Sequence, residues 1–277
     1  MYLVNPCYRA LREETEMIRQ LELINNLVAE GRLGFTFKEA VAALHVSPTA
    51  AANALRSLQD KGLIDRITHG VYTVRPLGSL GTSAVTDDLP LAVGAAFRGL
   101  DHRIGYSTAL SEHGLLSHPV RTIYVACTRQ VRIAKVSHRP LHVVIEKPST
   151  IHLGAERVGL SWRSNMERAL FECALRLDLV GGVERLAEAL GQAADDVSPS
   201  RIHRLATAFG HKGRAAERRL ASLSHALELP LELDPPLPPR RPFIQLDPSD
   251  NRQEWLDERY RVAWNVDVDE LRSVVSS

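Results

Sequence analysis

Residues 35–74 carry two helix-start signals in close succession, and few folds accommodate such a pair. Thr36 precedes Glu39 by three residues, which is the spacing of a capping box that satisfies free N–H groups at a helix start. Ser47 followed by Pro48 marks a second start, because the serine oxygen caps the first turn and proline lacks an N–H that this turn leaves unused. We therefore expect two helices joined by a tight turn.

The residues that follow complete the pattern. Gly62 lies where a left-handed C-terminal cap would end the second helix. Two short β-branched runs then flank Thr68-His69-Gly70, which predicts a hairpin. Helix, turn, helix and hairpin in this order are typical of a winged helix-turn-helix domain, in which the second helix enters the major groove of DNA.

The second helix shows two distinct faces when residues are placed at about 100° intervals. The face expected to pack on the core carries Ala51, Ala54, Leu55 and Leu58. The opposite face carries Thr49, Asn53, Arg56 and Asp60, with Ser57 beside them. Small polar side chains can approach base edges, and one arginine can form a bidentate contact with guanine. The alternative is a small helical subdomain whose polar face is only solvated, but capping, periodicity, glycine and hairpin agree in order and favour DNA reading.

The expected DNA contacts extend from this helix to the hairpin. Asp60 is unfavourable near phosphates, so it should mark the point where the helix leaves the groove. The residues predicted to bind DNA are Ser47, Thr49, Asn53, Arg56, Ser57, Lys61, Arg66 and His69.

Length and composition exclude several classes of protein. The 277 residues predict one large or two medium domains, and 44% apolar with 24% charged residues is ordinary for a globular chain. No apolar run approaches the roughly 20 residues that span a bilayer, and the N-terminus lacks the pattern of a signal peptide. Cys7, Cys127 and Cys173 are too widely spaced for a disulfide framework or a Cys-x-x-Cys metal site. We expect a cytoplasmic protein that does not enter a membrane.

The regions flanking the helix pair suggest how the chain divides. Residues 8–31 form an amphipathic pattern with one apolar stripe: Ile18, Leu21, Ile24, Leu27 and Val28. We expect this first helix to pack on the other two, and its length could also provide a dimer contact. Residues 75–90 are rich in Pro, Gly, Ser and Asp without periodicity, which predicts a domain boundary near residue 80. The expected domains are a DNA-binding winged helix at 1–80 and a C-terminal domain at 81–277.

The sequence pattern of the C-terminal region predicts an α+β domain with a small, mainly antiparallel sheet and a helical bundle. Helical segments are expected at residues 91–97 and 107–115. Strand-like runs follow at residues 122–127, 131–136 and 141–145. Four helical patterns come next, at residues 165–177, 183–190, 198–209 and 213–227, the third capped by Ser198-Pro199. An extended proline-rich connector, a strand and a helical tail are expected at residues 234–239, 243–246 and 268–275.

The net charge of +1 does not by itself indicate a nucleic-acid partner, because binding depends on local phosphate contacts. Residues 98–147 are the basic part of the chain. This segment could form a second nucleic-acid surface, or a solvated sheet edge that its charge keeps from aggregating. We favour the sheet edge.

No catalytic or metal centre emerges from the sequence. His102, His113, His118, His138, His142 and His152 are dense, but none has the helical spacing of a zinc protease, so ordinary surface or hydrogen-bonded histidines are favoured. Glu146-Lys147 suggests a nuclease core, yet adjacent residues of a strand point to opposite faces. No glycine-rich phosphate loop is present. We predict a protein that is not an enzyme and has no cofactor.

Four places along the chain resemble the AbiEi-type antitoxins of type IV toxin–antitoxin (abortive infection) systems. They are the winged helix with its Gly62-Leu63-Ile64 and Gly70-Val71-Tyr72 stretches, the segment 106–115, Met166-Glu167-Arg168-Ala169-Leu170 with Gly181-Gly182, and Arg218-Arg219-Leu220 with the stretch 247–265. Each motif is short, and their order over nearly the whole chain carries the resemblance.

The resemblance implies an antitoxin of a phage-defence system that also represses its own operon at inverted repeats, with a homodimer on DNA as one arrangement. It further implies that the C-terminal domain counteracts a nucleotidyltransferase-type toxin, for which such systems require no stable complex. The antitoxin-domain residues that it suggests are Ser107, Glu112, His113, Arg168, Arg218 and Arg219. The alternative is a winged-helix regulator whose second domain binds a small effector or another protein.

Overall fold

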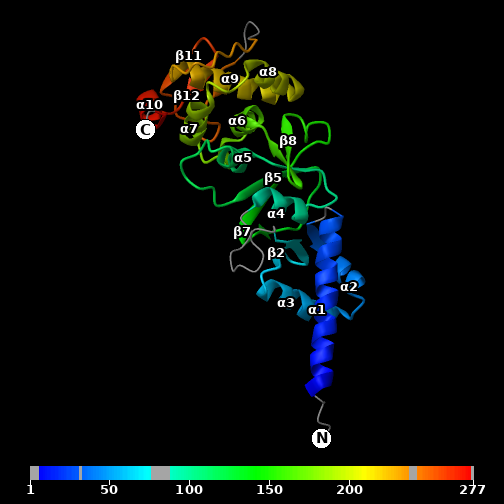
Figure 1. Cartoon of the computed structure of the whole chain (residues 1–277). Coiled ribbons are helices and arrows are strands. Elements are labelled where there is room, and N and C mark those ends of the chain that lie inside the picture. The colour runs from blue at the N-terminus through cyan, green and yellow to red at the C-terminus, as the bar shows by residue number, and fades with distance from the viewer. Residues whose placement is uncertain (1–5, 31–32, 76–87, 237–241, 276–277) are drawn as a thin grey trace. The chain divides into compact units, whose positions relative to one another are not determined.

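A computed structural model describes residues 6–30, 33–75, 88–236 and 242–275, with side chains from residue 17 onward (Figure 1). The chain forms two compact units. The first comprises residues 1–99, 133–140 and 159–161. The second comprises residues 100–132, 141–158 and 162–277. The boundary expected near residue 80 lies outside the described residues.

The first unit contains the expected winged helix. Its elements are α1 (Pro6–Ala29), β1 (Gly34–Thr36), α2 (Phe37–Leu44), α3 (Pro48–Asp60), β2 (Ile64–Thr68), β3 (Val71–Val74) and α4 (Leu89–Ala96). The strands form an antiparallel sheet in the order β1-β3-β2. The strand β1 was not expected from the sequence, and α4 clusters with this unit rather than with the C-terminal one.

Both expected helix caps are present. Thr36 accepts a hydrogen bond from the Glu39 backbone N–H at 3.2 Å, and the Glu39 carboxylate accepts one from the Thr36 N–H at 2.8 Å. Ser47 caps α3 by accepting from the Ala50 N–H at 3.3 Å. The helix ends as expected at Gly62, whose φ of +66° is a left-handed conformation that glycine adopts without strain.

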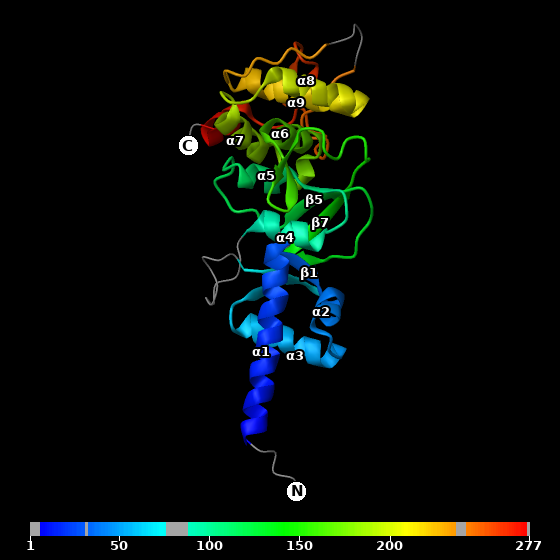
Figure 2. The same cartoon turned by 45° about the vertical axis from the view of Figure 1, so that its right-hand side comes forward.

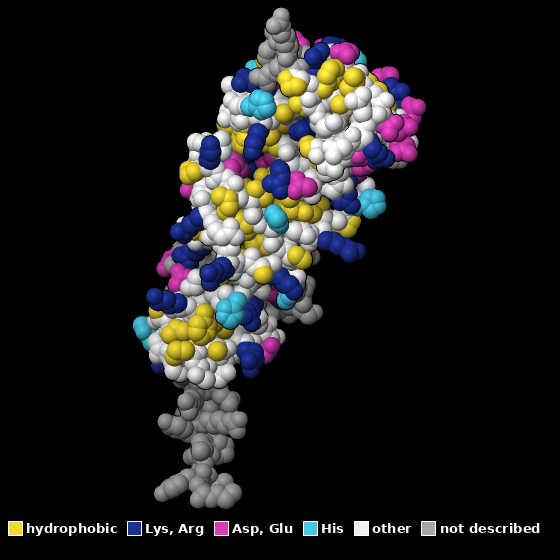
Figure 3. Space-filling view, turned by 180° about the vertical axis from the view of Figure 1, so that it is seen from behind, with side chains coloured by type: hydrophobic (Ala, Val, Ile, Leu, Met, Phe, Trp, Pro, Cys, Tyr) yellow, Lys and Arg dark blue, Asp and Glu magenta, His cyan; other side chains and the backbone are white. Residues whose placement is uncertain are grey.

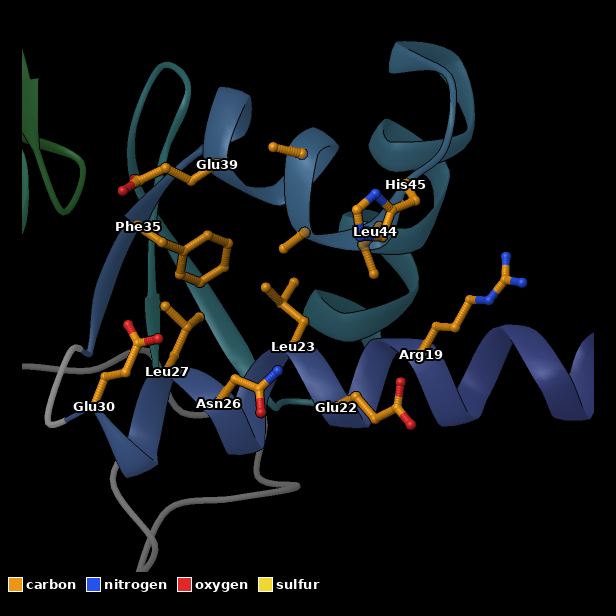
Figure 4. A pocket seen from close by; sticks show the side chains of 12 residues that line it. Arg19, Glu22, Leu23, Asn26, Leu27, Glu30, Phe35, Glu39, Leu44 and His45 are labelled. Carbon is orange, nitrogen blue, oxygen red and sulfur yellow. The ribbon is translucent and has the colours of Figure 1, made fainter.

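The core of the winged helix lies between α1, α2, α3 and the sheet. Figure 4 shows Leu23 and Leu27 of α1 pointing toward Phe35 and Leu44, and all four are buried. The expected apolar stripe on α1 is only partly correct, because Ile24 and Leu27 pack while three other members remain exposed. The exposed ones are Ile18 at 53%, Leu21 at 42% and Val28 at 45%. The stripe is wider than the helix face that the two neighbouring helices can cover.

The sheet of the second unit is mixed rather than mainly antiparallel. Its strands are β4 (His102–Ile104), β5 (Ile123–Cys127), β7 (Arg139–Ile145), β8 (Ala155–Val158) and β9 (Ser161–Ser164), in the order β7-β5-β4-β9-β8. β5 pairs antiparallel with β4, but β5 with β7 and β4 with β9 pair in parallel. The expected strand at 131–136 shrinks to β6 (Lys135–Val136), which forms a hairpin with Arg139 and Pro140 within the first unit.

The helices of the second unit pack mainly on one another (Figure 2). They are α5 (Tyr106–Glu112), α6 (Met166–Leu175), α7 (Val183–Ala193), α8 (Pro199–Ala208), α9 (Gly210–Ala226) and α10 (Val268–Val275). All were expected, although Ser198 makes no capping bond and instead lies 3.0 Å from the Ser200 hydroxyl. A second small sheet, of order β10-β12-β11, joins β10 (Ile244–Gln245), β11 (Trp255–Asp257) and β12 (Val262–Trp264). No helix in the described part of the chain is long and apolar enough to cross a membrane.

Candidate nucleic-acid interface

The helix α3 presents its polar face to solvent. Its buried residues are those expected from periodicity: Ala51, Ala54, Leu55 and Leu58. The exposed residues on the other side are Thr49, Ala52, Asn53, Arg56 and Asp60, and Ser57 is half-buried. Ala52 was not predicted as a contact, because alanine gives no polar signal in a sequence. Its place beside Asn53 and Arg56 could have been found from the helical angle alone.

Two of the predicted DNA contacts lie at the ends of α3. Ser47 at the start is exposed, but its hydroxyl is engaged in the helix cap. Lys61 at the other end is exposed, and its Nζ lies 3.3 Å from the Met17 sulfur of α1. The structure therefore brings Thr49, Asn53 and Arg56 together on one exposed face and directs Lys61 toward α1.

The β2–β3 hairpin holds the predicted wing residues. Arg66 and His69 are exposed, and the Arg66 Nη2 lies 2.9 Å from the His69 Nδ1. The Phe37 N–H donates to the Gly70 carbonyl at 2.8 Å, which fixes the hairpin tip to the start of α2. Gly70 has a φ of +71°, a conformation that suits glycine in a tight turn. The wing thus offers one cationic side chain, Arg66, with His69 hydrogen-bonded beside it.

Internal pairing neutralises two acidic residues of this unit. Asp65 on β2 is buried and receives two hydrogen bonds from the Arg75 guanidinium, at 2.8 and 3.0 Å. Glu39 contacts Arg98 at 2.7 Å. Burial alone would raise the pKa of Glu39, but hydrogen bonds from Thr36 and the charge of Arg98 bring it below its ordinary value. Asp60 remains as an exposed acid on the polar face of α3.

A groove of about 630 Å³ lies between α1 and α2 on another side of the unit (Figure 4). The carboxylates of Glu30 and Glu39 lie at one end of it, and Arg19 lies at the other. A third carboxylate, Glu22, also lines it. Carboxylates repel phosphates, so this groove is less suited to nucleic acid than α3 and the wing, even with Glu39 paired to Arg98.

Residues 22–75 match the model of a family described as "Transcriptional regulator, AbiEi antitoxin". This region is similar to the AbiEi antitoxins. The match spans α1 from Glu22, both helices of the helix-turn-helix and the wing, and it confirms the resemblance for that region. No curated protein matches the chain.

The fold is also similar to a solved structure, titled the crystal structure of RV2827C protein from Mycobacterium tuberculosis. The TM-score is 0.65 with 18% sequence identity, and the alignment covers 95% of each chain. At this identity the likeness concerns the fold alone. It extends the likeness of fold beyond residues 22–75 to 95% of the chain.

The residues predicted for the antitoxin domain lie mostly in the interior of the second unit. Ser107 on α5 is buried and donates to the Leu179 carbonyl at 2.7 Å. His113 Nε2 lies 2.8 Å from the Ser164 carbonyl oxygen, and burial lowers the pKa of His113. Glu112 is exposed at the end of α5.

The two arginines of α9 attach this helix to its surroundings. Arg218 donates to the carbonyls of Tyr260, Pro242 and Arg261. Arg219 donates to the carbonyls of Gln245 and Ala174, each at 3.0 Å. These bonds hold α9 to the small sheet and to α6. The antitoxin role of the six residues stays a prediction.

A buried cluster of four charges occupies the centre of the second unit. Arg103 and Arg168 are 0% and 1% exposed, and they pair with Glu146 and Glu172. Burial alone would raise the pKa of Glu146, but the charges of Arg103 and Arg168 bring it below its ordinary value. Sequence reasoning missed this cluster, because charged residues far apart in a chain give no pairing signal.

The basic segment 98–147 does not form one surface. Arg98 pairs with Glu39 in the first unit, whereas Arg103 is buried among carboxylates in the second. On the face shown in Figure 3, Lys and Arg side chains are scattered and interspersed with other types. Within the described residues, no group of three His, Cys, Asp or Glu side chains is arranged to hold a metal ion.

Proposed function

We propose that this protein is a cytoplasmic antitoxin and autorepressor of a phage-defence operon. In this proposal α3 enters the major groove of inverted repeats in the promoter, and the second unit counteracts a nucleotidyltransferase-type toxin. The observation that carries the proposal is the AbiEi match over 22–75, together with the exposed polar face of α3 inside that match.

The side chains of α3 suit specific base contacts. Arg56 can donate two parallel hydrogen bonds to guanine, and Asn53 can pair with the edge of adenine. Ala52 can contact the methyl group of thymine. Arg66 on the wing supplies positive charge for phosphates or the minor groove, with His69 beside it, and such contacts position the domain without reading sequence.

The exposed side of α1 supports a dimer on the repeats. Ile18, Leu21, Asn25 and Val28 are all exposed, and their spacing of three, four and three residues is that of a and d positions in a coiled coil. Isoleucine at a with leucine at d favours two strands, and a single asparagine at a sets their register. We propose that two copies pair along this face of α1 when they occupy the two half-sites.

A second candidate function is an effector-responsive regulator with the same winged helix. A hollow of about 750 Å³ in the second unit, which is in the size range of ligand pockets, favours it. The two candidates differ in whether the second unit acts on a toxin or on transcription.

One experiment with the full chain tests the proposal. The double variant Asn53→Ala/Arg56→Ala should lose binding to its own promoter in gel shifts and still rescue cells that express the cognate toxin. Lys38→Ala, an exposed change on α2, is the matched control and should preserve both activities. Full-length variants are preferable to fragments, because the first unit includes residues well beyond 80. Loss of rescue in a folded double variant would contradict separate activities, and rescue by neither protein would favour the effector-responsive regulator.

A further inference from the structure

A pocket of about 750 Å³ lies within the second unit, apart from the winged helix. Its walls come from the end of β7 and the following turn, the C-terminal end of α6, the α8–α9 corner and β10. Much of the lining is apolar: Ile145, Leu175, Phe209 and Ile244. Ile145 is 52% exposed although its side chain is large and apolar. A mostly apolar hollow with a few polar groups is typical of small-molecule sites.

The buried guanidinium of Arg219 forms part of this wall. Arg219 is 8% exposed, and its Nε and Nη1 donate to backbone carbonyls. In the described part of the chain no carboxylate lies within 4.0 Å of it, and neither of its two hydrogen bonds to carbonyls uses Nη2. Burial, together with the positive charge of Arg218, lowers the pKa of Arg219 to about 10, although the negative charge of Asp247 opposes the shift. Buried charges in proteins are normally paired, whereas this guanidinium forms no ion pair with the described residues and has only the more distant charge of Asp247 to balance it.

Two exposed lysines add to the positive charge at the pocket. Lys147 and Lys212 both line it, and neither forms an ion pair with any residue that the structure describes. The fourth strong cation of the lining, Arg176, is already paired with Asp178 at 2.7 Å. Three cationic groups therefore line the pocket without an ion-pair partner among the residues that the structure describes.

The pocket's own carboxylate cannot neutralise them. Glu146 is the acidic residue among those that line the pocket. One of its oxygens accepts from Arg168 at 2.6 Å and the other from Arg103 at 2.9 Å. The charge of Glu146 is therefore balanced by Arg103 and Arg168 in the buried cluster, and the pocket keeps an excess of positive charge.

We propose that this pocket binds a nucleotide, with the phosphates at Arg219, Lys147 and Lys212 and the base on the apolar wall. Three unpaired cations match several negative charges on one ligand, which a polyphosphate carries and a single carboxylate does not. Arginine and lysine are the usual partners of phosphate oxygens. The proposal is independent of operator binding, because every residue of the pocket lies in the second unit.

Isothermal titration calorimetry on the full chain tests this site, with ATP, tripolyphosphate and adenosine as probes. ATP should bind, tripolyphosphate should bind more weakly, and adenosine should bind at least about tenfold more weakly than ATP. The double variant Lys147→Ala/Lys212→Ala changes only exposed side chains and should weaken ATP binding by about tenfold or more. Arg219→Gln should weaken it as well, and its folding is checked separately because Arg219 also bonds to two carbonyls.

Two controls separate this pocket from other basic surfaces. Lys38→Ala on α2 and the α3 variant Asn53→Ala/Arg56→Ala should leave ATP binding unchanged. Absence of binding up to about millimolar ATP would overturn the proposal, since that concentration corresponds to about 4 kcal/mol of binding free energy. Binding that survives Lys147→Ala/Lys212→Ala, or adenosine binding as tight as that of ATP, would also overturn it.

Discussion

The buried charge cluster of the second unit gives the sharpest prediction, which is that Glu172→Gln strongly destabilises the fold. Glu172 is 1% exposed, and both of its carboxylate oxygens are occupied. Oε1 accepts from the Tyr106 N–H and, at 2.8 Å, from the Ser164 hydroxyl. Oε2 accepts from Arg103 at 2.6 Å and from Arg168 at 3.2 Å.

Glutamine fits this site in neither orientation. Its NH₂ group would face two donating guanidiniums at the Oε2 position, or the Tyr106 N–H at the Oε1 position. The substitution also leaves Arg103 and Arg168, both fully buried, to share the single charge of Glu146. Breaking a buried ion pair from one side costs about 3–5 kcal/mol, so we expect a loss of about that size in the free energy of unfolding.

Urea denaturation followed by circular dichroism measures this loss. The matched control is Glu156→Gln, which breaks a 2.5 Å ion pair with Arg163. The Glu156 side chain is 43% exposed. Exposed pairs contribute about 0–1 kcal/mol, so the control should change the free energy of unfolding little. Equal losses for the two variants would refute the claim that the buried cluster stabilises the fold.

Three further predictions concern other parts of the molecule. The pKa of Glu146 in the folded protein lies below its ordinary value of 4.5, so its contribution to stability is complete above pH 4.5 and is lost as the pH falls through the folded pKa. The free energy of unfolding of Glu146→Gln should therefore decrease less below pH 4.5 than that of the parent protein. Arg66→Ala should weaken binding to all DNA sequences alike and reduce the salt slope by about one, whereas a loss confined to one operator base would place Arg66 in direct readout. Leu21→Glu, on the exposed side of α1, should abolish cooperative binding to paired half-sites and leave single half-site binding intact; unchanged cooperativity would place the dimer contact elsewhere.

The helices were predictable from the sequence because their signals are local. The capping box at Thr36, the Ser47-Pro48 start and the left-handed Gly62 each act within one turn, and all three are present. The exposed face of α3 followed from periodicity for the same reason. Leu55 and Leu58 pack on the core, and their positions determine which side of α3 faces solvent.

The short strands and the long-range pairings were not predictable. β4 is only three residues of mixed polarity, His102–Ile104, and β9 carries two serines and an arginine, so neither gives an alternating apolar pattern. The parallel pairing of β5 with β7 depends on how the intervening chain returns, which no local signal encodes. Arg168 and Arg219, which the resemblance suggested as antitoxin-domain residues, are buried against carboxylates and carbonyls from distant parts of the chain, and no local signal predicts that burial.

The most direct test of the central claim is whether Arg56 reads a guanine of the operator. The affinity of the parent protein and of Arg56→Ala should be measured by gel shift on the native promoter and on promoters in which single guanines are replaced. At one guanine of each half-site, replacement should cost the parent about 1–3 kcal/mol and cost Arg56→Ala nothing further, because the contact is already absent. If every replacement costs both proteins the same, or if Arg56→Ala binds the native promoter as tightly as the parent, α3 does not read the operator through this face.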